Sequence, residues 1–284
     1  MSSRKPVGLI ASGRLADSAL VRLPGLCREL GPVAAASLRL ASRYANTLKC
    51  GRPAAAAEFE DCRMVAIQAA AEDMRGVIRL LRTAGVDWGG KPVVLLNDDL
   101  DASALSELGR EGALTCAAAV APGPGVPLVL AEGDAGAVRA VRDWAQRARA
   151  RCVELNAGTK LSYGAGVMAA NSLITPILEA ALRSFRAAGL GLTDSRRILA
   201  YLAGAAIRSH QAHGRKGWVN PALPARQPAI RAQLKALGAL DPELARFHMQ
   251  VLRCSLHLLG QAGDWLEPPS ANDSSDLDSP ARIK

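Results

Sequence analysis

Short apolar runs alternate with segments of helical periodicity through the first half of the chain. Strands that alternate with helices form sheets of parallel strands with helices packed on them, so the pattern predicts a parallel α/β domain. The expected helices are Arg39–Leu48, Glu72–Thr83, Ala104–Gly109 and Ala135–Arg149. The expected strands are Val7–Ala11, Val33–Ser37, Met64–Gln68, Val93–Asn97, Leu114–Ala119, Pro127–Ala131 and Cys152–Leu155.

After Leu155 the sequence shows helical periodicity only. Thr159–Ala188 is expected to be one long helix, and Pro176 is expected to kink it. Three further helices are expected: one capped by Asp194 or Ser195 and ending near Ala212, one at Ala229–Leu237 and one at Pro242–Leu259.

The composition suits a protein with an aliphatic core. Of 284 residues, 49% are hydrophobic but only 4% are aromatic, so Ala, Leu, Val and Ile must fill the interior. The formal net charge is +9, with a local group of arginines between Arg139 and Arg151. This group falls on an expected helix with few aromatic residues nearby for base stacking. We therefore interpret it as a solvated helix face and predict no nucleic-acid partner.

The cysteines and the most apolar segment indicate a soluble cytoplasmic protein. No charged-then-apolar leader precedes Val7, so no signal peptide is expected. Gly164–Leu182 is apolar but carries Asn171, Thr175 and Glu179, which suits a buried helix better than a membrane span. None of the cysteines forms a close CxxC pair, as expected of free thiols in a reducing compartment: Cys27, Cys50, Cys62, Cys116, Cys152 and Cys254.

The end of the first strand offers a turn of small residues, Ala11-x-Gly13-x-x-Ala16. A dinucleotide-binding turn of the G-x-G-x-x-G/A type needs small residues so that backbone N–H groups can approach the pyrophosphate. Only the middle glycine of that pattern is present, so an ordinary tight turn between strand and helix would look much the same.

The residues at the end of the second expected strand bear on the choice between NAD and NADP. An NAD site normally ends this strand in Asp or Glu, which accepts from the ribose 2′-hydroxyl. Here Ser37 and Arg39 stand there instead, and an arginine can donate two bonds to a 2′-phosphate. The alternative is an exposed arginine at a helix start. If a dinucleotide binds, the sequence predicts NADP(H), held by Ala11, Ser12, Gly13, Arg14, Leu15, Ser37, Arg39, Gln68 and Ala69.

Several segments together resemble one group of proteins. They are Ser12-Gly13-Arg14, Arg39, the helix that begins Lys160-Leu-Ser-Tyr-Gly, Asn220-Pro221 followed by Arg226, and Asp241-Pro242-Glu243-Leu244. The chain resembles, over roughly residues 6 to 260, bacterial Rossmann-like proteins with a C-terminal helical domain of unknown function. Their relatives include pyrroline-5-carboxylate and ketopantoate reductases and hydroxyisobutyrate dehydrogenase.

The resemblance implies a domain organisation. Residues 1–156 would form a Rossmann-like dinucleotide-binding domain, and residues 157–264 an all-helical domain like those of the 6-phosphogluconate dehydrogenase superfamily. From Glu267 the chain is rich in Pro, Ser, Asn and Asp, so residues 265–284 are expected to be a disordered tail.

The resemblance also singles out Lys160 as the candidate catalytic residue. In the related dehydrogenases a lysine at the start of the first long helix faces the nicotinamide cleft and can act on a substrate oxygen as acid or base. The alternative is an exposed lysine at a helix start. Two departures weaken the assignment: Gly164 stands where the family has histidine, and no His-Pro-Leu follows the fifth strand.

The sequence thus gives two hypotheses. The first is an NADP(H)-dependent oxidoreductase acting on a small carbonyl, imine or hydroxyacid compound; the second is a catalytically degenerate dinucleotide- or metabolite-binding protein. His210 and His213 have the spacing of a ligand pair, but no third ligand is apparent and no metal site is predicted. Because Thr159–Ala188 is too apolar for a lone surface helix, a homodimer that buries the helical domain is expected.

Overall fold

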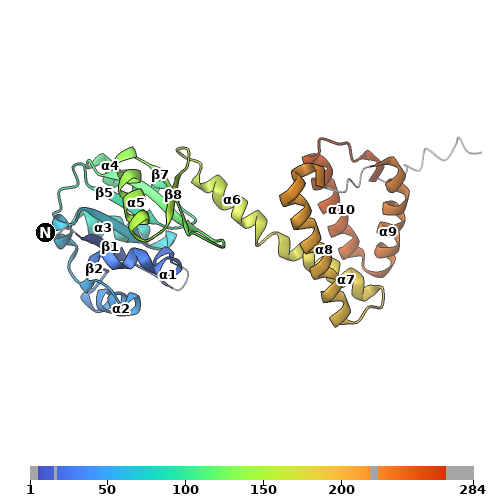
Figure 1. The fold of residues 1–284 in the computed structure, drawn as a ribbon, viewed down its shortest axis with the longest axis horizontal. Coiled ribbons are helices and arrows are strands. Elements are labelled where there is room, and N and C mark those ends of the chain that lie inside the picture. The colour runs from blue at the N-terminus through green and yellow to red at the C-terminus, as the bar shows by residue number, and fades with distance from the viewer. Residues whose placement is uncertain (1–5, 16–17, 218–222, 267–284) are drawn as a thin grey trace, which may run out of the picture. The chain divides into compact units, whose positions relative to one another are not determined.

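The computed structural model describes residues 6–15, 18–217 and 223–266. The chain divides into two compact units, Met1–Met168 and Ala169–Lys284, which are described separately. The first unit contains every strand found among the described residues, and the second is helical (Figure 1).

An eight-stranded sheet forms the centre of the first unit. Its strand order is β3-β2-β1-β4-β5-β6-β7-β8, and all neighbours are parallel except β6 and β7. β1 and β4 are fully buried, and β5 is buried except at Pro92, which is why the apolar runs identified most strands correctly. The strands are β1 (Val7–Ala11), β2 (Leu30–Ala34), β3 (Arg52–Pro53), β4 (Met64–Gln68), β5 (Pro92–Leu96), β6 (Leu114–Ala121), β7 (Leu128–Gly133) and β8 (Arg151–Glu154).

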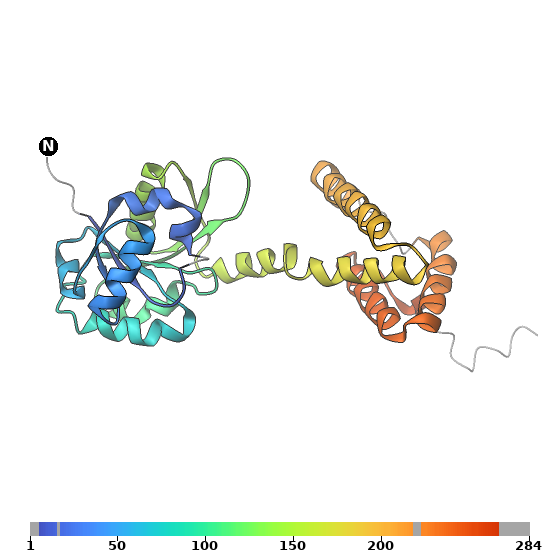
Figure 2. The same cartoon turned by 90° about the horizontal axis from the view of Figure 1, so that it is seen from below.

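The β6–β7 pair departs from the purely parallel sheet that the sequence predicts. Ala121 pairs with Leu128 and Cys116 with Gly133, so the two strands form an antiparallel hairpin. A parallel connection needs a crossover of about a dozen residues or more, and residues 122–127 are too few for one. The loop projects beyond the sheet (Figure 2).

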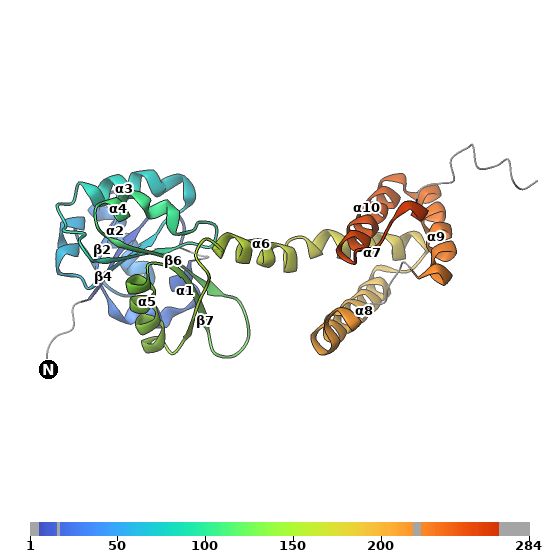
Figure 3. The same ribbon diagram turned by 90° about the horizontal axis from the view of Figure 1, so that it is seen from above.

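Helices cover both faces of the sheet (Figure 3). One core cluster joins α1, α2 and α5 to one face, and a second joins α3 and α4 to the other. The predicted second strand is shifted: β2 ends at Ala34, and Ser37 caps α2 instead of ending the strand. The elements are α1 (Ala19–Arg22), η1 (Pro24–Glu29), α2 (Leu38–Leu48), η2 (Ala56–Asp61), η3 (Ala71–Asp73), α3 (Met74–Arg82), η4 (Ala102–Leu105), α4 (Ser106–Arg110), α5 (Ala135–Arg147) and α6 (Lys160–Ala170).

In the second unit α9 packs on α10, and α7 contacts both α8 and α10. The predicted tail begins with Trp265 and Leu266, which lie in η7; residues 267–284 lie outside the described residues. The resemblance segment Asn220-Pro221 lies outside them too. The elements are α7 (Ile174–Ala187), α8 (Leu192–His213), η5 (Gly214–Gly217), η6 (Pro224–Arg226), α9 (Gln227–Leu240), α10 (Pro242–Leu258) and η7 (Asp264–Leu266).

Two predicted helices of the C-terminal half differ in the structure. The expected single helix Thr159–Ala188 is two helices, α6 and α7, separated by turn residues 171–173. Pro176 has no N–H to donate to the carbonyl of residue 172, and its ring would clash with that carbonyl in a regular helix. The helix is therefore interrupted about one turn before the proline. The predicted caps of the next helix, Asp194 and Ser195, lie inside α8, because Gly191 holds the N-cap position.

The helices from α6 to α8 leave many large apolar side chains exposed. Lys160–Ala187 is long and apolar enough to cross a membrane by length and composition, with a mean hydropathy of 1.4 and almost none of that stretch buried. Only Ala180 is buried on α7, and only Ser195 on α8. The exposed side chains are Leu161, Met168, Leu173, Ile177, Leu192, Ile198, Tyr201, Leu202 and Ile207.

Candidate functional site

The strand order places a crevice at the carboxyl end of β1. In the sheet β1 lies between β2 and β4. The connection after β1 leads to β2 on one side, and the connection after β4 leads to β5 on the other side, so the two connections run in opposite directions. Ligands of open α/β sheets bind at such a switch point, outside the carboxyl ends of the strands. The turn of Ser12 and Gly13 lies at this point, where Ser12 N–H donates to the carbonyl of Gln68 at 2.8 Å.

Side chains from two helical segments hold this turn. The Ser12 hydroxyl donates to Asp73 Oδ2 at 2.6 Å, and the Tyr44 hydroxyl donates to the Gly13 carbonyl at 2.9 Å. Burial and the nearby Asp73 carboxylate raise the pKa of Tyr44, which keeps that donor protonated. Gly13 has φ +75°, a conformation that favours glycine. The middle glycine of the predicted pattern is therefore required by the backbone, while Ala16 lies outside the described residues.

A cavity of about 450 Å³ opens beside the turn, between the end of β1, the residues after β2, and the length of α3. It combines an apolar floor with an acidic group at the turn and a basic group on α3. The lining residues are Ile10, Ala11, Ser12, Ala36, Asp73, Gly76, Val77, Arg79, Leu80 and Thr83.

The predicted phosphate residues Ser37 and Arg39 do not line this cavity. The Ser37 hydroxyl accepts from Leu40 N–H at 3.3 Å and caps α2, and Arg39 is exposed two residues later. Arg14 is also exposed, whereas Leu15 is buried. Sequence reasoning missed the arginine that does line the cavity, Arg79. The available signal was position, because α3 starts soon after β4 and so lies at the same edge.

Gln68, at the end of β4, has an unusual environment. It is only 9% exposed, and its Oε1 has no hydrogen-bond partner among the described residues. A buried amide oxygen without a partner is costly, which points to a donor supplied from outside the chain. The next residue, Ala69, is buried, and its carbonyl accepts from Asn97 Nδ2 at 2.8 Å.

Lys160 lies at the start of α6, and its side chain is completely buried at 0% exposure. Its Nζ donates to three carbonyls of the loop after β5: Asn97 at 2.5 Å, Asp98 at 3.1 Å and Leu100 at 2.6 Å. Its backbone N–H donates to Glu132 Oε2 at 2.9 Å. Burial lowers the pKa of Lys160, although the carboxylates of Asp98 and Glu132 act in the opposite direction. All three ammonium protons therefore have acceptors.

The loop that Lys160 holds is itself ordered by Asn97. The Asn97 Oδ1 accepts from the N–H groups of Asp99 at 2.7 Å and Leu100 at 2.9 Å. Asp98 forms a two-point ion pair with Arg22 of α1, at 2.6 and 2.9 Å. Burial and the same Asp98 carboxylate raise the pKa of Tyr163, one turn after Lys160. A buried lysine and an amide thus meet in the loop after β5, and Tyr163 lies on the next turn of α6, near Asp98.

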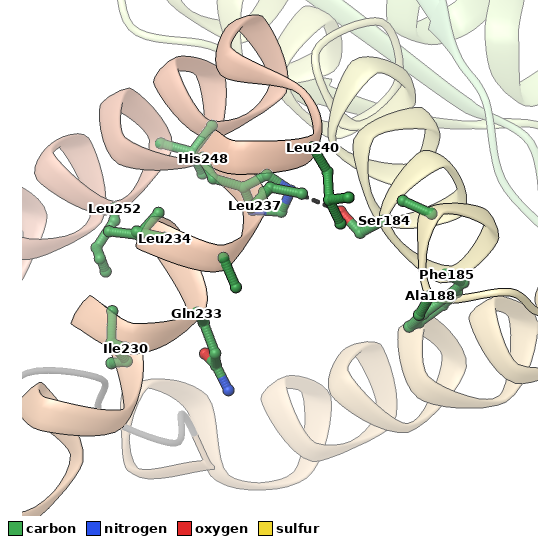
Figure 4. Close-up of a pocket in the computed structure, with 13 residues that line it drawn as sticks. Ser184, Phe185, Ala188, Ile230, Gln233, Leu234, Leu237, Leu240, His248 and Leu252 are labelled. Atoms are coloured by element: carbon green, nitrogen blue, oxygen red, sulfur yellow. Dashed lines mark hydrogen bonds between the residues drawn. The ribbon is translucent and has the colours of Figure 1, made fainter.

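The second unit has a larger cavity of about 720 Å³, between α7, α9 and α10 (Figure 4). Its lining is mainly aliphatic, with a polar contact of 3.1 Å between Ser184 Oγ and His248 Nε2. When the Ser184 hydroxyl donates its proton to the Ala180 carbonyl at 2.9 Å, it can only accept from a His248 Nε2 that carries hydrogen. This polarity is the reverse of that in an activated serine nucleophile. Among the described residues, no cluster of His, Cys, Asp or Glu could hold a metal ion.

Comparison with known proteins was informative only at the level of structure. The sequence matches no protein-family model and no curated protein. The fold matches an imine reductase from Aspergillus terreus in complex with NADPH4 and dibenz[c,e]azepine, with TM-score 0.65, 12% identity, and 91% of this chain and 95% of that chain covered. It also matches an imine reductase from Myxococcus stipitatus in complex with NADP+, with TM-score 0.61, 14% identity, and 89% and 94% covered.

A third match is a reductive aminase from Aspergillus terreus in complex with NADPH and ethyl levulinate, with TM-score 0.59, 12% identity, and 92% and 96% covered. These likenesses span nearly the whole length of each chain. They confirm the fold class and, at the level of the fold, the resemblance that the sequence indicated. The protein thus has a Rossmann-type domain followed by a helical domain, the architecture of these oxidoreductases.

Proposed function

We propose that this chain is an NADP(H)-dependent oxidoreductase that acts on a small carbonyl, imine or hydroxyacid compound. The observation that carries the proposal is the Gly13 turn at the switch point, beside a cavity and next to Gln68, whose Oε1 has no partner among the described residues. Oxidoreductases of the same fold bind NADP+ or NADPH. This likeness favours the enzyme over the alternative of a binding protein without activity.

The residues present fit a dinucleotide. Gly13 is exposed at the turn, beside the Asp73 carboxylate that binds Ser12, and a diphosphate would have to approach its backbone next to that carboxylate. The Gln68 oxygen offers an acceptor to a nearby amide or hydroxyl donor. NADPH, when bound, supplies the hydride, and the chain supplies orientation and proton transfer. Lys160 is the candidate for proton transfer, and Asn97 orders the loop after β5 whose carbonyls hold the lysine.

The role of Lys160 as acid or base remains a prediction. To protonate a substrate, Nζ would have to exchange one of its three carbonyl acceptors for the substrate atom. Its lowered pKa would ease that proton transfer. Oxidation of NADPH in the presence of a panel of small ketoacids, ketones and imines tests the activity itself. A complete lack of turnover, with intact nucleotide binding, would favour the alternative.

Cofactor preference gives the sharpest test of binding. We expect NADPH to stabilise the chain more than NADH does; a ligand at a hundred times its Kd adds about 2.7 kcal/mol. Replacing Arg39 by alanine should remove most of that advantage and leave NADH binding nearly unchanged, since a bond to a charged phosphate contributes roughly 1.5–3 kcal/mol. Arg43→Ala, one turn later on α2, is the matched control. Equal or absent melting shifts with both nucleotides in the unmodified protein would contradict the proposal.

We also propose that the protein is a cytoplasmic homodimer that buries its exposed helices. Apolar patches larger than a few hundred Å² are uncommon on monomers and mark interfaces. Leu173, Ile177 and Leu202 are exposed along α7 and α8. Tyr201 of α8 has the highest exposed fraction among the apolar side chains of α6 to α8, at 70%. A second copy of the same chain would cover such surfaces symmetrically.

Sedimentation tests the dimer. The chain has a mass of 29.7 kDa, and we expect a species of twice that mass at micromolar concentration. Replacing Leu173 and Ile177 together by glutamate should dissociate it, because burying two unpaired carboxylates is strongly unfavourable. Leu38→Glu, at a leucine on α2 that is more exposed than either of them, should leave the dimer intact. A stable monomer in the unmodified protein would contradict this proposal.

A further inference from the structure

Three arginines meet around one cavity at the edge of the sheet that ends with β8. The cavity has a volume of about 440 Å³ and lies between the end of α5, the start of β8 and the loop that joins β6 to β7. α5 packs on β8 at this edge (Figure 1). The lining residues are Val126, Arg142, Gln146, Arg149, Ala150, Arg151 and Cys152. A cavity of this volume can hold a small metabolite.

The positive charge around this cavity is only partly compensated. Arg142 pairs with Glu154 at 2.9 Å, and both side chains are about half exposed. Neither Arg149 nor Arg151 takes part in any of the ion pairs found among the described residues. Between them the three guanidinium groups thus have one carboxylate partner. A cleft lined by one sign of charge concentrates ions of the opposite sign.

The backbone at Arg149 indicates that its side chain has a role besides folding. α5 ends in a C-cap at Ala148, and Arg149 follows it with φ +60°. The Arg149 N–H donates to the Gln146 carbonyl at 3.0 Å, and the Ala150 N–H donates to the Ala145 carbonyl at 2.8 Å. Helices that end with this pair of bonds usually have glycine at the left-handed position, because other residues are strained there. The arginine therefore lowers stability and adds a guanidinium to the cavity.

The helix dipole accounts for only part of this charge. A cation in the last turn of a helix is favourable because it lies near the negative end of the dipole. Arg147 already occupies that turn of α5 and pairs with Glu29. Arg151 lies beyond the helix, in β8, and it also lines the neighbouring cavity of about 430 Å³ beside residues 122–127. Another role is therefore needed for the arginines that follow the helix.

We propose that Arg142, Arg149 and Arg151 form a binding site for a small molecule that carries two or more phosphate or carboxylate groups. A planar guanidinium donates two parallel bonds to either kind of group, so three of them suit a ligand with more than one anionic group. Four strands separate β8 from β1 in the sheet, which places the site about 24 Å from the Gly13 turn. The site does not rest on the proposed function.

Calorimetric titration of the full chain with pyrophosphate and with citrate tests the site. We expect at least one of the two probes to bind, with an affinity that falls as salt is added, because exposed charges are screened. Arg151→Gln keeps most of the side chain but removes its charge, and it should weaken that probe by roughly tenfold. Arg139→Gln, at an exposed arginine of α5 outside the cavity lining, removes the same charge and should change the affinity by less than about twofold.

Arg149→Gly gives the sharper result, because stability and binding should change in opposite directions. Glycine adopts the left-handed conformation without strain, so the melting temperature of the unliganded protein should rise by roughly 1–3 °C. Loss of the guanidinium should weaken the same probe by roughly tenfold. A variant that is more stable and binds less well has not lost the site through misfolding.

The outcomes separate this proposal from the dinucleotide proposal. If the chain does not bind NADPH but binds a probe through Arg149 and Arg151, the anion site stands and the proposed function fails. If neither probe binds, or if NADPH displaces a probe whose affinity the arginine variants leave unchanged, the anion site is wrong. If a single-stranded oligonucleotide binds more tightly than both probes and Arg151→Gln weakens it, the surface recognises nucleic acid, and its assignment to a small molecule is overturned.

Discussion

Replacing Lys160 by methionine is expected to lower the free energy of unfolding by about 3 kcal/mol or more. The lysine is fully buried, and its Nζ supplies donors to the carbonyls of Asn97, Asp98 and Leu100. Methionine has a similar length but no donor, so these carbonyls would lose their partner. Losing a buried donor costs roughly 1–3 kcal/mol for each acceptor left unsatisfied, and water would compensate only part of it.

Urea unfolding at neutral pH measures this effect, with Lys235→Met on the exposed face of α9 as the control. At about 2–4 °C per kcal/mol, the Lys160 variant should also melt at least roughly 6 °C lower. An unchanged unfolding midpoint would mean that the carbonyls are readily hydrated, and that the lysine is free to serve the substrate. A large loss of unfolding free energy would show that Lys160 positions the loop after β5, whether or not it also acts on a substrate.

The sequence was most informative where burial dictates composition. Central strands such as β4 and β5 are buried on both faces, so they stand out as continuous apolar runs. Gly13 could be identified because its backbone needs a conformation that other residues adopt with strain. The helical domain could be recognised as helical, because no apolar run after residue 155 has the length and flanking signals of a strand.

The sequence was least informative where partners come from distant segments. That Lys160 would meet the carbonyls after β5, 60 residues or more away, depends on where α6 begins relative to the sheet. Whether β7 runs parallel or antiparallel to β6 depends on the length of the loop that joins them. The apolar run of β7 would look the same in both cases. The part of the cavity lining that α3 supplies, which includes Gly76 and Arg79, was not predicted because pattern reasoning looked for phosphate contacts at the end of the second strand.

The largest effect of pH is expected above pH 9, where the protein should lose stability steeply. Burial raises the pKa of Cys27 and Cys116 to about 12 and that of Cys62 to about 11, from the ordinary 9.0. In the unfolded chain these thiols ionise near pH 9, while in the folded chain they keep their protons. The stabilisation is therefore complete below pH 9 and is lost as the pH rises toward 11 and 12.

The slope follows from three thiols acting together. Each contributes about 1.4 kcal/mol per pH unit, so the free energy of unfolding should fall by about 4 kcal/mol per unit between pH 9 and 11. Lys160 acts in the opposite direction: its lowered pKa means that the unfolded chain binds the proton more tightly, so its contribution rises with pH up to about 10.5. One lysine offsets at most about a third of the effect of the three thiols.

Urea unfolding at several pH values from 7 to 10.5, under reducing conditions, measures this slope directly. The triple variant Cys27→Ala, Cys62→Ala and Cys116→Ala should be less stable at pH 7, because small cavities replace buried sulfur. Above pH 9 its stability should fall much less steeply, and the remaining fall would come from Cys50, Cys152, Tyr44 and Tyr163, whose pKa values burial also raises. Cys254→Ala should behave like the unmodified chain, since Cys254 is exposed. If the triple variant keeps the steep alkaline loss, the buried thiols are not its cause, and groups common to both proteins must carry it.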